Sequence, residues 1–291
     1  MVLMAAFDCV DDTKLLSKAV IGEIIGDGKE EDSNKIAEVF GSEKAGRKLL
    51  LYLLGMFNSI YHSFSSMKIK SPMKYPKIHT QLKIIQLFVT AGRDTTYFAP
   101  DCLALLKQGD GNEHSKKEDS TRRSEILKSI EESLYTFLNQ NLYGLLKADS
   151  KCAIFIKAAL NCNQVSNHYV KPLLERLSDI ATDKFEIGTD NMVEGAAGHM
   201  LLKKVISHDK VRSASGIETF SQMLLSHLKA KNTIESYVKC NRGAFLLLTI
   251  MQTEIPDIVK CVKDSTKSHK ATLKSQKTRG AELLLEKLNS I

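Results

Sequence analysis

A spacing of apolar residues that recurs along the chain limits its fold more than any other feature. A small residue is followed by apolar pairs three and four positions further on, and again seven and eight positions further on. Residues at these intervals share one face of an α-helix, and a small first residue lets that helix begin close to a neighbour. The pattern starts at Gly46, Cys152, Gly198, Gly243 and Gly280, with one position broken in the last stripe.

A longer amphipathic helix is predicted before each of the last four stripes. Its apolar positions are, in chain order, Ile126, Ile130, Leu134, Phe137 and Leu138; Val170, Leu173, Leu174, Leu177 and Ile180; Ile217, Phe220, Leu224 and Leu228; and Val259, Val262 and Leu273. One pair of helices cannot bury both of its apolar faces alone, so consecutive pairs must stack. We therefore predict an all-α fold, an α-solenoid of helix–turn–helix repeats. An irregular helical bundle is the alternative.

Two stretches interrupt the repeat. Residues 107–123 are polar and mixed in charge, which predicts a surface loop. Residues 55–92 hold five lysines and no acidic residue, lack the stripe, and are predicted to pack poorly. Because Gly55-Met56-Phe57 and Ala91-Gly92 fit codons that contain splice sites, one hypothesis is that 55–92 translate a retained intron. A genuine insertion is the alternative.

Several classes of protein are disfavoured by what the sequence lacks. The six cysteines form no CxxC pair, which favours buried free thiols in a reducing compartment over a zinc or redox motif. No apolar run suits a membrane-spanning helix, and the first residues do not form a signal peptide, so an intracellular, soluble protein is expected. No histidine has the spacing of a metal site, and no phosphate loop or nucleophile elbow occurs. We predict no enzyme, no metal and no cofactor.

Several motifs resemble the Puf-A-like branch of the Pumilio-repeat family, and they occur in that family's order. They are VLMAAFDCVDDTKLL at the start, GRKLLLYLL at 46–54, LLKQGDGNEHSKKE at 105–118, EGAAGHMLLKKVISHDK at 194–210, and NRGAFLLLTI with RGAELLLEKL near the end. The likeness covers 1–54 and 93–291. It implies that 1–54 are the C-terminal part of the Pumilio repeats, that 93–291 are a CPL-type helical repeat region, and that the chain is the C-terminal portion of such a protein.

The resemblance also implies a function. Members of this branch are armadillo-like Pumilio solenoids that bind RNA or DNA with little sequence preference. They act in large-subunit ribosome assembly and pre-rRNA processing, and some regulate translation. We therefore expect a nuclear, nucleolar protein whose partners are RNA, either pre-rRNA or mRNA, and pre-ribosomal proteins. No membrane and no small-molecule substrate is expected.

Ordinary Pumilio repeats read one base each, with side chains one, two and five positions after the small residue. Here these positions hold Arg47, Lys48 and Leu51; Ala153, Ile154 and Lys157; His199, Met200 and Lys203; Ala244, Phe245 and Leu248; and Ala281, Glu282 and Leu285. Leucine and alanine cannot hydrogen-bond to a base edge, and lysine suits a phosphate at least as well as a base. The sequence therefore predicts phosphate contact without sequence-specific readout.

Local lysine-rich faces must supply the electrostatic attraction, because the net charge of +7 falls to about +2 without 55–92. One predicted helix face carries Lys263, Lys267, Lys270, Lys274 and Lys277, and a second cluster is Lys203, Lys204, Lys210 and Arg212. The candidate RNA-binding residues are Arg47, Lys48, Lys157, His199, Lys203, Lys204, Arg242, Lys263, Lys267, Lys270 and Lys274. The alternatives are solvated helix faces and a helical-repeat scaffold for proteins without direct RNA contact.

Overall fold

Helices are the regular elements of this protein, and no β-strand occurs among the residues that the structure describes. The computed structural model describes Lys48, Thr95 and residues 99–107, 119–148, 150–162, 165–189 and 191–290. The helices are α8 (Pro100–Lys107), α9 (Asp119–Ala148), α10 (Ser150–Leu160), α11 (Asn167–Ala181), α12 (Ala196–Ser207), α13 (Asp209–Ala214), α14 (Phe220–Lys231), α15 (Ile234–Lys239), α16 (Asn241–Met251), α17 (Pro256–Thr266), α18 (Lys270–Ser275) and α19 (Arg279–Asn289). The predicted all-α class is confirmed.

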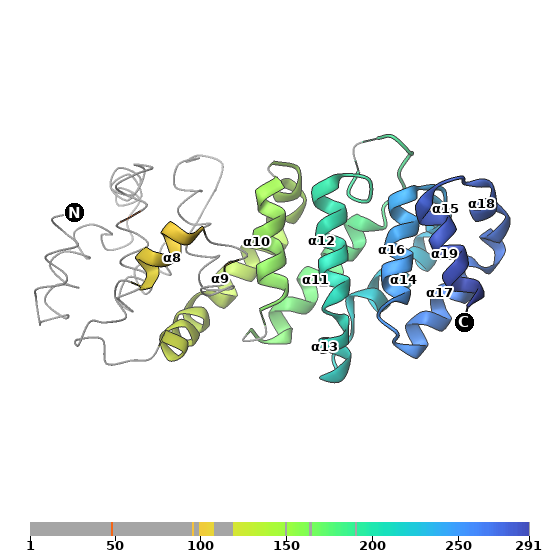
Figure 1. The fold of residues 1–291 in the computed structure, drawn as a ribbon. Coiled ribbons are helices and arrows are strands. Elements are labelled where there is room, and N and C mark those ends of the chain that lie inside the picture. Colours follow the sequence, from red (N-terminus) through yellow and green to blue (C-terminus); the bar gives the residue numbers. More distant parts are fainter. Residues whose placement is uncertain are drawn as a thin grey trace, which may run out of the picture. The chain divides into compact units, whose positions relative to one another are not determined.

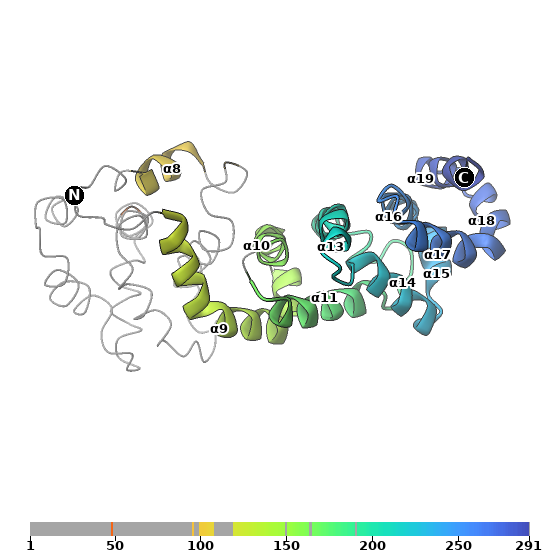
Figure 2. The ribbon, with the colours of Figure 1, turned by 90° about the horizontal axis from the view of Figure 1, so that it is seen from below.

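The chain divides into two units. One comprises residues 1–136 and 162–166, and the other comprises residues 137–161 and 167–291. Within the second unit, α10, α12, α16 and α19 lie side by side in one layer, and α11, α14 and α17 form a second layer against them (Figures 1 and 2). Each helix of one layer therefore packs on its neighbours in the same layer and on a helix of the other. This stacking of helix pairs is the predicted α-solenoid.

The predicted stripes form the core of the second unit. In α12 the four stripe residues Leu201, Leu202, Val205 and Ile206 are all buried, and the equivalent positions of α10 and α16 are buried as well. The stripe of α19 is weaker, because Leu284 and Leu288 are buried while Leu283 is only partly so. Opposite them, α11 and α14 contribute the leucines predicted for the longer helices. The stripe that begins at Gly46 lies outside the described residues.

The glycines that open three of the stripes allow backbones to approach closely. A Cβ atom on Gly243 would lie 2.4 Å from the carbonyl oxygen of Tyr237 and 2.7 Å from its Cα atom. A Cβ atom on Gly198 would lie 2.3 Å from the Met192 carbonyl oxygen, and one on Gly280 would lie 2.4 Å from that of Asn241. The start of each of these helices therefore touches the backbone of another segment, as the sequence predicted.

We expect Gly243→Ala to lower the free energy of unfolding by about 1–3 kcal/mol, since the backbone that a Cβ atom would strike cannot rotate away. Urea unfolding followed by circular dichroism measures this loss. Gly144→Ala is the matched control, because Gly144 lies inside α9 and a Cβ atom added there would meet nothing within 4 Å. That control should stabilise the helix by about 0.5–1 kcal/mol. Equal effects at both sites would contradict the close-approach argument.

Two predictions about element boundaries are wrong. Val262 and Leu273 do not share one helix, because α17 ends at Thr266 and a 3₁₀ turn at Lys267–His269 separates it from α18. The Thr266 hydroxyl donates a hydrogen bond to the Val262 carbonyl at 2.8 Å, and Ser268 and His269, which are weaker helix formers, lie in the 3₁₀ turn that follows. The predicted loop 107–123 is also too long, because α9 already begins at Asp119 with residue types favoured at helix starts.

A buried ion pair links three helices of the second unit. Asp209, which is 0% exposed, accepts hydrogen bonds from the backbone N–H groups of Phe220 and Ser221, both at 2.9 Å, and from the Ser221 hydroxyl at 2.5 Å. The Arg212 guanidinium lies 3.4 Å from the same carboxylate and donates to the Leu160 carbonyl at 2.8 Å. The pair therefore caps α14 and joins it to the end of α10.

Candidate nucleic-acid interface

Charge is distributed unequally among the helices of the second unit. The helices α10, α12 and α16 contain lysine, histidine and arginine but not one aspartate or glutamate. The helices α11 and α17 of the opposite layer and α19 of the same layer contain both signs, while α14 contains basic residues only. Because α10, α12 and α16 are neighbours, their cationic side chains share one layer. We call the surface formed by these side chains the basic surface. Its residues are Lys157, His199, Lys203, Lys204 and Arg242.

These five residues come from three successive helices. Lys157 lies near the end of α10, His199, Lys203 and Lys204 lie on α12, and Arg242 lies in the first turn of α16. Lys204 is exposed and the other four are partly exposed. The structure therefore places candidates that are 85 positions apart in the sequence, from Lys157 to Arg242, on consecutive helices of one layer.

The cations of the two layers differ in their partners. In the α11–α14 layer, Lys231 lies 2.7 Å from the carboxylates of Asp179 and Asp183, and Lys171 lies 3.0 Å from that of Glu218. By contrast, Lys203 and Arg242 form no ion pair with any acidic group in the described part of the chain. The basic surface thus has cations whose charge the fold leaves uncompensated.

Arg242 is oriented by the loop that precedes α12. The Asn191 side chain accepts hydrogen bonds from the backbone N–H groups of Val193 and Glu194 at 3.0 and 2.9 Å. The Glu194 carboxylate accepts from the Gly188 N–H at 2.9 Å and from the Asn191 amide at 3.1 Å. The ordered Glu194 carbonyl then accepts a hydrogen bond from the Arg242 guanidinium. One guanidinium N–H is used in this way, and the others are left for a ligand.

His199 reports the positive potential of the basic surface. Burial, together with the charges of Lys203 and Arg242, lowers the pKa of His199 to about 4. The imidazole is therefore neutral near pH 7, and its buried Nδ1 atom has no hydrogen-bond partner among the described residues. The two cations add to the effect of burial, and an anion beside them would be attracted by their charge.

The positions that read bases in other Pumilio repeats are poorly placed here. Ala244 and Leu248 of α16 are buried, and so is Ala281 of α19, so none of them can reach a base. On α10 and α12, Ile154 is 48% exposed and Met200 is 53% exposed, beside Lys157 and Lys203 in the sequence. The surface thus combines cations with two apolar side chains, without a pair of donors and acceptors that would select a base.

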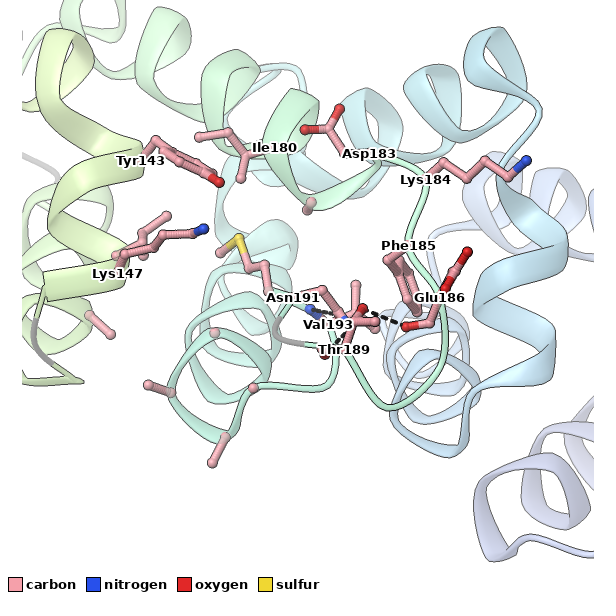
Figure 3. Close-up of a pocket in the computed structure, with 18 residues that line it drawn as sticks. Tyr143, Lys147, Ile180, Asp183, Lys184, Phe185, Glu186, Thr189, Asn191 and Val193 are labelled. Atoms are coloured by element: carbon pink, nitrogen blue, oxygen red, sulfur yellow. Dashed lines mark hydrogen bonds between the residues drawn. The ribbon is translucent and has the colours of Figure 1, made fainter.

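A separate cavity of about 610 Å³ lies at the start of α12 (Figure 3). Its walls come from the end of α9, the end of α11 and the loop before α12. The Lys147 ammonium lies 4.7 Å from the centre of the Tyr143 ring on one wall. The lining lysines, Lys147 and Lys184, are matched by Asp183 and Glu186, so the cavity does not extend the cationic surface.

The remaining sequence candidates lie elsewhere or outside the described residues. Arg47 is outside them, and Lys48 is exposed. Lys263 lies on α17, Lys267 lies on the 3₁₀ turn, and the last two candidates lie on α18, so the predicted single helix face of Lys263, Lys267, Lys270 and Lys274 does not exist.

The second predicted cluster is also divided by the structure. Arg212 is 8% exposed and pairs with Asp209, so it cannot contact a phosphate without leaving the core. Lys210 lies 3.1 Å from the Glu254 carboxylate, whereas Lys203 and Lys204 remain on the basic surface. The absence of acidic residues from α10, α12 and α16 is the sequence signal that would have separated Lys203 and Lys204 from Lys210 and Arg212.

Neither a metal site nor a membrane span emerges from the described residues. Within them, no group of three or more histidine, cysteine, aspartate or glutamate side chains could hold a metal ion. No helix in the described part of the chain is long and apolar enough to cross a membrane. Cys102, Cys162 and Cys240 are buried and Cys261 is partly buried, and these four cysteines form no disulfide with one another.

Comparison with known proteins identifies relatives of this chain in sequence and in structure. Residues 83–218 match the CPL (NUC119) domain. Pumilio homolog 3 of Homo sapiens is 30% identical over 297 residues, which cover 100% of this chain, and the Danio rerio protein is 31% identical over 294 residues. The crystal structure of human Puf-A superposes with a TM-score of 0.63 at 28% identity and covers 98% of this chain. The chain is therefore similar to Puf-A over nearly its whole length.

The Puf-A likeness confirms the resemblance that the sequence motifs predicted, although it concerns part of a longer protein. This chain spans 38% of the human Pumilio homolog 3 sequence and 47% of the human Puf-A crystal structure. A second solved structure, of human Puf-A in complex with DNA, superposes with a TM-score of 0.62. The domain boundaries predicted at residues 54 and 92, and the intron hypothesis, stay predictions.

Proposed function

We propose that the second unit binds nucleic acid through the sugar–phosphate backbone, with little dependence on base sequence. The observation that carries this proposal is that Lys203 and Arg242 form no ion pair within the described part of the chain, on a surface built from three neighbouring helices without an acidic residue. A lysine that meets a phosphate displaces a condensed counterion, so such a surface favours a polyanion. The buried side chains at Ala244 and Leu248 argue against base readout in that repeat.

The relatives support the proposal and suggest its biological setting. Human Puf-A has been solved in complex with DNA, and this chain aligns with that structure over 98% of its length. We further propose RNA, either pre-rRNA or mRNA, as the physiological ligand. A nucleolar role in ribosome biogenesis or in translational regulation, without catalysis, follows from the resemblance to the Puf-A-like branch. Lys48, Lys263, Lys267, Lys270 and Lys274 stay candidates for additional phosphate contacts.

A protein-binding scaffold is the second candidate function. Ile154 and Met200 are about half exposed on the same two helices as Lys157 and Lys203. Exposed apolar side chains beside lysines also suit an acidic amphipathic segment of a protein partner. The two functions are separated by the ligand that binds, because only a polyanion-binding surface should hold unrelated oligonucleotides equally well.

We expect Lys203→Gln to weaken the binding of oligonucleotides of unrelated sequence uniformly, by roughly 3- to 10-fold. Fluorescence anisotropy with labelled single- and double-stranded RNA at low and moderate salt measures this change. Lys229→Gln on α14 removes the same charge from an exposed position outside the basic surface and should leave the affinity unchanged. An equal loss for both variants, or no binding by the unmodified chain, would reject the proposed interface.

A further inference from the structure

Three nitrogen-bearing side chains gather where α12 and α16 begin. His199 and Lys203 are four residues apart on α12 and therefore share a helix face. Arg242 comes from α16, which packs beside α12, and the Glu194 carbonyl holds its guanidinium. The charges of both Lys203 and Arg242 act on the imidazole of His199, so each of these two cations lies within electrostatic reach of His199.

No acidic group among the described residues compensates this cluster. The nearest loop carboxylate in sequence, that of Glu194, is occupied by the N–H groups of Gly188 and Asn191. On the other elements that pack against α12, the charged groups act elsewhere. Lys157 of α10 and the Asp209–Arg212 pair of α13 exert their electrostatic effect on His208, at the other end of α12. On α14, the side chains of His227 and Lys231 face the Asp179 carboxylate. The charges that act on the His199 imidazole are therefore those of Lys203 and Arg242, while the Glu194 carboxylate also contacts the Cys240 side chain.

An anion placed among these three groups would change the protonation of His199. Without it, burial and the two cations keep the imidazole neutral, because they lower its pKa to about 4. An opposite charge within hydrogen-bonding range favours the protonated form and raises such a pKa by roughly 1–3 units. If the pKa is higher in the complex than in the free protein, the complex binds more protons, so affinity must increase as pH falls.

We propose that His199, Lys203 and Arg242 form a subsite for one phosphate group of a bound strand, and that His199 takes up a proton when the subsite is filled. This inference rests on the proposed function and adds to it the coupling of binding to pH. A rise of about two units in the pKa of His199 would make the affinity about fourfold higher near pH 5.5 than near pH 7.5.

The test compares three proteins with a labelled oligouridine of about 15 nucleotides, at constant ionic strength, near pH 5.5 and near pH 7.5. Uracil does not titrate in this range, so the ligand keeps its charge. For the unmodified chain and for His227→Gln, the ratio of the two affinities should be about fourfold larger than for His199→Gln. His227 is the control because it is a partly exposed histidine in the other layer, beside Asp179.

The possible outcomes separate the subsite from the wider function. If His199→Gln binds with the same pH ratio as the unmodified chain, or loses affinity equally at both pH values, the proton-coupled subsite is rejected while backbone binding stands. If no protein binds the oligouridine, the proposed function itself fails. Proton NMR of the His199 ring provides a second measurement that needs no variant to fold: its pKa should rise when oligouridine is added, and an unchanged pKa overturns the inference.

Discussion

Asp209→Ala is expected to lower the free energy of unfolding of the second unit by about 3–5 kcal/mol. The substitution leaves the Arg212 guanidinium buried without its carboxylate, and it removes the acceptor for two backbone N–H groups at the start of α14. Burial raises the pKa of the Asp209 carboxyl, while the hydrogen bonds from Ser221 and Phe220 and the charge of Arg212 oppose that rise. The Asp209 carboxylate therefore contacts both the start of α14 and the Arg212 side chain of its own helix, α13.

The measurement is the shift in the urea midpoint, followed by circular dichroism. Asp209→Asn should cost less than the alanine variant, because the amide oxygen can still accept one of the hydrogen bonds. Asp264→Ala is the matched control on an exposed position of α17 and should change stability by no more than about 0.5 kcal/mol. A loss at Asp209 that is no greater than at Asp264 would show that the buried pair does not hold these helices together.

Reversing three charges of the basic surface, with Lys157, Lys203 and Lys204 all changed to glutamate, is expected to reduce nucleic-acid affinity on the order of 100-fold or more. Each lysine removed costs a phosphate contact worth about 1 kcal/mol, and each glutamate added repels the strand. All three lysines are on α10 or α12 and at least partly exposed, so the fold should tolerate the change. Anisotropy titration with one labelled RNA at fixed salt measures the loss.

The matched control changes Lys128, Lys229 and Lys260 to glutamate. These three lysines are exposed on α9, α14 and α17, and the variant has the same net charge as the first one. General electrostatic attraction would make both triple variants equally weak. A localised interface predicts that the control loses far less affinity, because its lysines lie outside the basic surface.

The sequence was sufficient to predict the layered helical core. The stripe after Gly198 and the stripe after Gly243 each identified a helix and its buried face, because a regular helix fixes which positions point inward. The sequence also predicted that each stripe needs a small first residue, although it did not identify the backbone atoms that contact this residue. The element boundaries at Thr266 and Asp119 were missed, since weak local preferences decide where a helix ends.

The candidate site was harder to predict than the core. The sequence spacing assigned Arg212 to a basic cluster, but in the structure its guanidinium is buried and paired with Asp209. This burial depends on how α13 packs against α14. Lys210 likewise forms an ion pair, with Glu254, which is 44 positions away in the sequence. Burial of α13 and pairing with a distant residue decide which cations stay available, and a list of lysines does not contain that information. The absence of acidic residues from α10, α12 and α16 does contain part of it.

The salt dependence of RNA binding tests the central claim most directly, namely that the basic surface holds a sugar–phosphate chain. A plot of the logarithm of the association constant against the logarithm of salt concentration should fall steeply for the unmodified chain. For the Lys157, Lys203 and Lys204 triple variant, the slope should be shallower by about 2–3, while the Lys128, Lys229 and Lys260 variant keeps the original slope. Equal slopes for all three proteins would contradict the account.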